Sequence, residues 1–175
     1  PKMWRYRPHA AILTSIEHDH VDIYPDEASY RAAFVGFVER IPPDGVLVAF
    51  AGDPAVREIA AAARCRVVYY AATGDDCGDV SPLWLAAPSL SQGGAQPFEL
   101  FVGGTSAGAV LSPLSGVHNV RNATAAIALV CETSEGTIPV SDLTTSLRSF
   151  AGVKRRQELL AVVRGRPRAK QGGVE

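Results

Sequence analysis

The chain has 175 residues, of which 47% are hydrophobic and 20% are charged, and its formal net charge is -1 at pH 7. This composition is that of one globular domain with a sizeable core, and it excludes disordered and fibrous proteins. Because the chain has no basic surplus, its charge does not indicate nucleic acid or an anionic membrane as a partner.

Two further features concern the cellular compartment. The three cysteines, Cys65, Cys77 and Cys131, form no Cys-x-x-Cys pair, which favours a reducing cytosol over a disulfide framework or a zinc ribbon. No apolar run approaches the roughly 20 residues of a membrane helix, and no basic-then-apolar leader opens the chain. We therefore expect a cytoplasmic protein without a targeting segment.

The N-terminal part of the chain alternates between apolar runs and helical periods. Apolar runs at 10–16, 46–51 and 66–71 predict strands that are buried on both faces of a sheet. Between them, Asp26 and Asp53 indicate helix N-caps, and each precedes an apolar face at helical spacing. Strand, helix, strand, helix, strand in this order predicts a parallel sheet with right-handed crossovers.

The pattern changes in the second half of the chain. Three short β-like runs, at 83–87, 98–102 and 107–111, are joined by Gly-rich connections of the hairpin type. Two helices are predicted after them, at about 119–132 and 141–149. The expected fold class is therefore α/β, a mostly parallel sheet flanked by helices with a small appended antiparallel sheet.

The segment after the first predicted strand carries five ionisable side chains, those of Glu17, His18, Asp19, His20 and Asp22. Ligands of open α/β sheets bind where the strands leave the core at their carboxyl ends. Two imidazoles among three carboxylates could bind a divalent metal or form an acid-base cluster near neutral pH. The spacing matches no standard zinc pattern, and a solvated loop whose acids cap the next helix is the alternative.

A pair of asparagines marks the start of the third predicted helix. Asn119 and Asn122 are three residues apart and lie on neighbouring positions of one helix face. An amide offers a donor and an acceptor together, which is what reading an adenine edge requires. The simpler interpretation is that Asn119 only caps the helix.

Two other segments could bind phosphate. Residues 103–108, Gly-Gly-Thr-Ser-Ala-Gly, superficially resemble a phosphate loop, but no lysine follows them, so a plain hairpin turn is favoured. The basic run 154–156 could hold phosphate, because the planar fork of arginine matches phosphate oxygens, or it could be a solvated face.

Three motifs in this order resemble those of the Mur ligase family. Residues 15–22 resemble its strand-end motif, Glu-x-Asp-His-x-Asp, and residues 116–123 resemble its helix start, Gly-x-His-Asn-x-x-Asn-Ala. The run Phe-Ala-Gly-Val-Lys-Arg-Arg at 150–156 resembles its junction to the C-terminal domain. Residues 18–24 and 152–156 are most similar to the murein-recycling branch, and the branch that adds L-alanine is the alternative.

The resemblance implies a fold, an activity and a set of ligands. Residues 1–149 would be the distal part of the family's central ATP-binding domain, and 150–175 the hinge and truncated start of the C-terminal domain. The activity would be ATP-dependent amide ligation, in which a substrate carboxylate takes the γ-phosphate and an amine attacks the acyl phosphate. The cofactors would be ATP and Mg²⁺, and the partners UDP-N-acetylmuramate and an amino acid or murein peptide.

The resemblance also implies a metal site in the strand-end motif. His20 would coordinate a magnesium ion that bridges the substrate and ATP, with Glu17 and Asp19 supporting it. Because magnesium prefers oxygen ligands, a structural role for His20 stays open.

The other two motifs would hold the nucleotide. Asn122, with His118 and Asn119 beside it, would bind the base, and Arg156 would neutralise phosphate charge in the transition state. Both roles suit phosphoryl transfer, which needs mainly positioning and charge stabilisation.

Some family features are missing from the sequence. The Gly-x-x-Gly-Lys-Thr/Ser phosphate loop does not occur, and we expect it N-terminal to Pro1 in a longer protein. The pair Gly52-Asp53 departs from the paired aspartates of the family at that strand end. We therefore expect the chain alone to be inactive, and a fold module without chemistry is a second interpretation. A Rossmann-type dinucleotide site is disfavoured because no Gly-x-Gly-x-x-Gly follows a predicted strand.

Overall fold

The computed structural model describes residues 2–19, 22–91 and 93–150. Within them, one sheet contains six strands in the order of the sequence. The neighbours from β1 to β4 are parallel, whereas β5 runs antiparallel to β4, and β6 to β5. The strands are β1 (Ala10–Leu13), β2 (Val46–Phe50), β3 (Arg66–Ala72), β4 (Trp84–Pro88), β5 (Gln96–Val102) and β6 (Thr105–Ser112).

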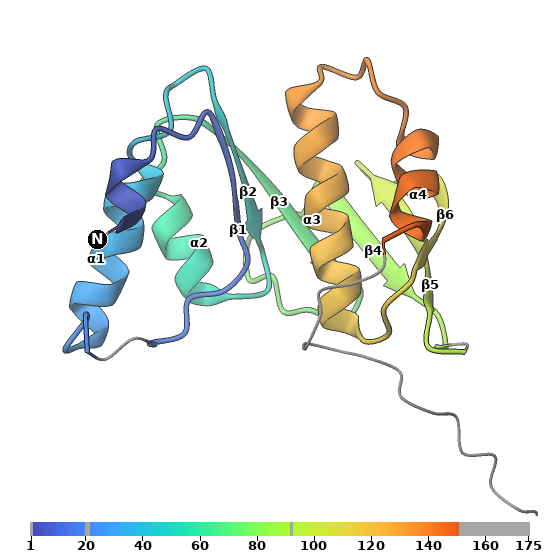
Figure 1. Cartoon of the computed structure of the whole chain (residues 1–175), viewed down its shortest axis with the longest axis horizontal. Helices are drawn as coiled ribbons and strands as arrows, with labels where there is room; N and C mark the ends of the chain where they lie inside the picture. The colour runs from blue at the N-terminus through green and yellow to red at the C-terminus, as the bar shows by residue number, and fades with distance from the viewer. Residues whose placement is uncertain (1, 20–21, 92, 151–175) are drawn as a thin grey trace, which may run out of the picture.

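Helices cover both faces of this sheet. Figure 1 shows α1 and α2 on one face, and α3 and α4 on the other. The helices are η1, a 3-10 turn (Lys2–Arg5), α1 (Glu27–Val38), α2 (Pro54–Ala60), α3 (Val117–Thr133) and α4 (Val140–Arg148).

Strand β2 shows how the sheet separates two hydrophobic cores. Successive side chains of a strand point to opposite faces. Leu47 and Ala49 pack in the core under α1 and α2, whereas Val46 and Val48 pack in the core under α3. All four side chains are buried, which explains why the run is continuously apolar instead of alternating.

The expected fold class is confirmed, with one difference in pairing. The run predicted at 83–87 is β4, and it pairs parallel with β3, Tyr70 lying opposite Trp84. Residues 73–83 connect the two strands, a length close to the dozen or so residues that a parallel crossover needs. Their Gly- and Asp-rich composition indicated a turn region. It did not reveal that the chain returns to the end of the sheet where β3 begins, so that β4 runs parallel to β3.

The Gly-rich segment between β5 and β6 is a hairpin turn, as the sequence favoured. Gly103 and Gly104 have φ angles of 57° and 81°, and a two-residue hairpin turn of type I′ needs positive φ at both central positions. The resemblance of this segment to a phosphate loop therefore has no structural basis. The hinge predicted for 150–175 lies, apart from Phe150, outside the described residues, so the domain boundary stays a prediction.

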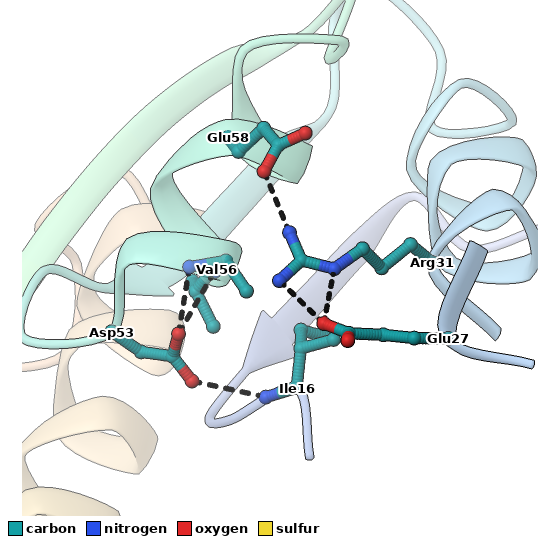
Figure 2. Close-up of polar contacts among 7 residues, drawn as sticks. Ile16, Glu27, Arg31, Asp53, Val56 and Glu58 are labelled. Atoms are coloured by element: carbon teal, nitrogen blue, oxygen red, sulfur yellow. Dashed lines mark hydrogen bonds and ion pairs between the residues drawn. The ribbon is translucent and has the colours of Figure 1, made fainter. Parts of the chain in front are cut away.

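Both predicted N-caps are confirmed, and one of them has a second partner. The Asp26 carboxylate accepts a hydrogen bond from the Ser29 backbone N–H at 2.7 Å. The Asp53 carboxylate accepts N–H bonds from Ala55 at 2.8 Å and from Ile16 at 3.0 Å, as Figure 2 shows for Ile16. Asp53 therefore caps α2 and also holds the chain where it leaves β1.

An exposed ion-pair network joins α1 to α2 beside this contact. The Arg31 guanidinium lies 2.8 Å from a Glu27 oxygen and 2.6 Å from a Glu58 oxygen (Figure 2). Solvent screens such pairs, so their contribution to stability is small.

The cysteines and the helices of the described residues bear on the expected compartment. All three cysteines are free thiols. No helix in the described ranges has the length and apolar character of a membrane span.

We expect Asp53→Ala to lower the free energy of unfolding by about 2 kcal/mol, because it removes the α2 cap and the bond to Ile16. Urea denaturation measures this loss. The matched control is Asp26→Ala, which removes the exposed cap of α1 and should cost less. Equal losses for the two variants would mean that the Ile16 contact contributes nothing.

Candidate functional site

A cavity of about 530 Å³ lies at the carboxyl ends of the first two strands, and we call it the strand-end cavity. Parallel α/β sheets bind ligands at this edge. Its lining comes from the loop after β1, the β2–α2 connection, β3 and the start of α3: Thr14, Ser15, Glu17, Phe50, Gly52, Asp53, Pro54, Tyr70, His118, Arg121 and Asn122.

A second cavity of about 640 Å³, the helix cavity, lies between α3, α4 and the chain after β6. It is lined by Asn119, Ala123, Ala126 and Leu147 among others. His118 and Asn122 line both cavities, so the two adjoin at the start of α3. A third cavity, of about 660 Å³, lies against η1 and residues 7–9, at the opposite ends of the strands and away from these side chains.

The start of α3 is held by hydrogen bonds from its neighbours. Gly116 is the N-cap residue, with φ 98° and ψ 143°, and it has no side chain to cap the helix. Its N–H donates to the buried Gln96 side chain at 3.2 Å. The Asn119 amide donates to the Ser115 carbonyl at 2.7 Å. The prediction that Asn119 merely caps the helix is therefore wrong, because this side chain fixes the loop that precedes the helix.

The structure brings two of the predicted motifs together. Glu17 follows β1, and His118 and Asn122 belong to α3, yet all three line the strand-end cavity. All three side chains are exposed, so a ligand can reach them.

The other described members of the acidic cluster have different surroundings. His18 Nε2 lies 2.9 Å from the Tyr24 carbonyl oxygen, and its ring lies 5.6 Å from the Tyr30 ring. Burial raises the pKa of the Tyr30 hydroxyl, and the Asp19 charge raises it further. Asp19 does not line the strand-end cavity. The alternative that acids of this cluster cap the next helix is wrong, since Asp26 supplies that cap.

The predicted metal ligand His20 and the predicted phosphate ligand Arg156 lie outside the described residues. In the ranges that are described, no three His, Cys, Asp or Glu side chains group together to hold a metal. In the strand-end cavity both Asp53 oxygens already accept backbone N–H bonds, whereas Glu17 is exposed. The described residues do not by themselves fit a magnesium ion, and the site around His20 stays a prediction.

Sequence reasoning missed an ion pair beside the strand-end cavity, in which Arg121 lines the cavity and Asp75 lies behind it, only 6% exposed. Arg121 Nε donates to an Asp75 oxygen at 3.1 Å, and Arg121 Nη2 donates to the other oxygen. The guanidinium carbon lies 4.9 Å from the centre of the Phe50 ring. Asp75 follows β3, so the rule about strand ends would have found it had it been applied to the third strand. Gln96 gave no comparable signal, because its role depends on a partner twenty residues away.

The fold is that of an α/β protein with a cavity at the carboxyl ends of its parallel strands, the edge at which such sheets bind ligands. A family model described as the Mur ligase middle domain matches residues 2–130. The chain therefore belongs to the Mur ligase family.

Relatives and solved structures agree with this family. The UDP-N-acetylmuramate–L-alanine ligase of Mycolicibacterium smegmatis is 36% identical over 164 residues, covering 91% of this chain and 32% of that protein. The ligase of the same name from Acidothermus cellulolyticus is 37% identical, covering 85% and 30%. The structure of UDP-N-acetylmuramate:L-alanyl-gamma-D-glutamyl-meso-diaminopimelate ligase from Neisseria meningitides has a TM-score of 0.70 at 26% identity, covering 88% of this chain and 44% of that one. The chain thus spans about a third of the length of the curated relatives it matches.

We expect Gly116→Ala to lower the free energy of unfolding by about 1–2 kcal/mol, because the backbone there has a conformation that favours glycine. An added Cβ would also lie 3.0 Å from His118 Cε1, so the ring must move. The His118 ring resonances in the NMR spectrum report that movement.

The matched control is Gly136→Ala, which also has positive φ but has no atom within 4 Å of the added Cβ. It should leave the His118 resonances in place. Unchanged resonances in both variants would contradict the assigned contact.

Proposed function

We propose that the chain is the distal part of the ATP-binding central domain of a ligase that joins an amino acid or peptide to UDP-N-acetylmuramate. The reaction proceeds through an acyl phosphate and serves peptidoglycan recycling. The observation that carries the proposal is the meeting of Glu17 with His118 and Asn122 around one cavity at the strand ends, in a member of the Mur ligase family.

The start of α3 suits a nucleotide base. The Asn122 amide is exposed and offers a donor and an acceptor to the edge of the base. His118 lies beside it between the two cavities, and the apolar side chains of Ala123 and Leu147 offer a surface for the face of the base. Asn119 supports this site indirectly, because its amide donates to the Ser115 carbonyl and so holds the loop before α3.

The chemistry requires positioning and charge stabilisation more than covalent help. Glu17 lines the strand-end cavity together with the start of α3, and there we place the phosphates and the metal. Magnesium, when bound, would offset the charge of the triphosphate, with His20 as the proposed ligand and Asp19 as support. Arg156 is the proposed partner of the transferred phosphate. The proposed compartment is the cytosol, with which three free thiols are compatible.

The alternative is an L-alanine ligase, and it has a specific observation in its favour. The curated relatives at 36% and 37% identity are UDP-N-acetylmuramate–L-alanine ligases. Assay of the intact protein that contains this segment, with UDP-N-acetylmuramate and either L-alanine or the murein tripeptide, decides between the two. Product formed only with L-alanine would overturn the recycling assignment.

We expect the 175-residue chain alone to release no ADP from ATP in the presence of magnesium and both substrates, because its sequence contains no Gly-x-x-Gly-Lys-Thr/Ser loop to seat the triphosphate. A coupled assay for ADP measures this. Turnover by this chain would contradict the proposal that the reaction requires a phosphate loop, which this sequence does not contain.

We expect ADP at millimolar concentration to shift the Asn122 side-chain amide signals of the ¹⁵N-labelled chain. Asn122→Ala should weaken ADP binding about tenfold, since an unpaired base edge loses one or two hydrogen bonds. The matched control is Thr145→Ala, which removes an exposed side chain of α4 that lines neither cavity. Equal affinity in the two variants would remove Asn122 from the base site.

A further inference from the structure

We propose that Arg121 is a further ligand-binding residue of the strand-end cavity, where its guanidinium holds an anionic oxygen of a phosphate or carboxylate. The inference rests on the proposed ligase function and adds a residue to its site. Arg121 stands at one of the unspecified positions of the His-Asn-x-x-Asn motif, so the motif itself assigns it no role.

The position of Arg121 places it with the proposed nucleotide residues. It lies one residue before Asn122 on α3, and both line the strand-end cavity, as does Glu17. About 30% of the Arg121 side chain is exposed, so a ligand in the cavity can reach it.

Two contacts fix the orientation of the guanidinium. Asp75 binds its Nε and Nη2 in the bidentate manner, which sets the plane of the group. The Phe50 ring lies 4.9 Å from the guanidinium carbon. A group held in this way loses little further rotamer entropy when a ligand binds.

Asp75 is itself held firmly. Its side chain is only 6% exposed, and one of its oxygens accepts a hydrogen bond from the Ala72 backbone N–H at 2.8 Å. The support for Arg121 therefore comes from the end of β3 and not from a mobile surface acid.

The ion pair does not use up the donors of Arg121. A guanidinium has five N–H groups, and two of them bond Asp75. Within the described ranges, Asp75 is the only hydrogen-bond partner of the guanidinium, so three N–H groups remain for a ligand.

The distribution of charge in the strand-end cavity favours Arg121 as the ligand of an anion. Among the described residues that line it, Arg121 is the only side chain with a permanent positive charge, while Glu17 and Asp53 are acids. A ligand with phosphate or carboxylate groups gains most from a cation at such a place, because a partly buried site screens charge less than water does.

A purely structural role is the competing interpretation, and the chain contains its own control. Arg66 pairs with Glu132 at 2.6 Å, so it ties α3 to β3 just as Arg121 does through Asp75. Arg66 lies at the start of β3 and lines neither of the two cavities. An effect that Arg121 shares with Arg66 is therefore structural, and an effect confined to Arg121 concerns the ligand.

The first experiment observes the arginine Nε–H signals of the ¹⁵N-labelled 175-residue chain by NMR. We expect inorganic pyrophosphate or acetate to shift the Arg121 signal while the Arg66 signal stays in place. A response to pyrophosphate alone assigns a phosphate ligand, and a response to acetate alone assigns a carboxylate. If neither probe moves the Arg121 signal, or if both arginines move equally, the proposal is overturned.

The same samples separate this inference from the proposed function. With ADP, a shift at Asn122 without one at Arg121 supports the proposed base site and contradicts a phosphate contact of Arg121. Shifts at neither residue overturn both.

Variants then measure the size of the effect. We expect Arg121→Met to weaken pyrophosphate binding about tenfold, since one or two charge-assisted hydrogen bonds are lost, and Arg66→Met to leave it unchanged. Arg121→Lys keeps the charge without the planar fork, and it should recover part of the affinity. Thermal unfolding of each variant checks that it is folded, and the signals of the unsubstituted chain give the result independently of any variant.

Discussion

The direction of helix α3 across the sheet is the constraint on which the rest of the site depends. Arg66, at the start of β3, pairs with Glu132 near the end of the helix, whereas Asp75, just after β3, pairs with Arg121 near its beginning. These two pairs show that α3 runs antiparallel to β3. Its N-terminal residues therefore come to the carboxyl ends of the strands, where the chain after β1 also emerges.

The packing under α3 maintains this direction. Val120, Ile127 and Ala128 are buried against the face of the sheet that carries Val48 and Val68. The hydrophobic core supplies most of the stabilisation of such a helix, and the ion pairs at its ends set its position along the strands. Gln96, the first residue of the antiparallel strand β5, also fixes the start of α3, because its side-chain oxygen accepts a hydrogen bond from the Gly116 N–H.

The site combines residues that differ in how readily a sequence reveals them. Glu17 and Asn122 stand in recognisable motifs, at the end of an apolar run and at the start of a helical period. Asp53 was expected as a cap, but its bond to Ile16 joins residues far apart in the chain, and no local pattern indicates such a contact. His18 lies inside the motif and yet bonds the Tyr24 carbonyl, so membership of a motif did not determine what its side chain contacts.

The amino-acid sequence by itself determined the α/β class, most of the helices and strands, both aspartate caps and the family resemblance. These features depend on periodicity, capping chemistry and motifs, all of which act over a few neighbouring residues. Only the tertiary structure decided that β4 pairs parallel with β3, that Asp53 holds the Ile16 backbone N–H, and that Arg121 meets Asp75 beside Asn122. Strand pairing and cavity lining join distant segments through the packing of whole elements, and local residue patterns contain too little information to specify which segments meet.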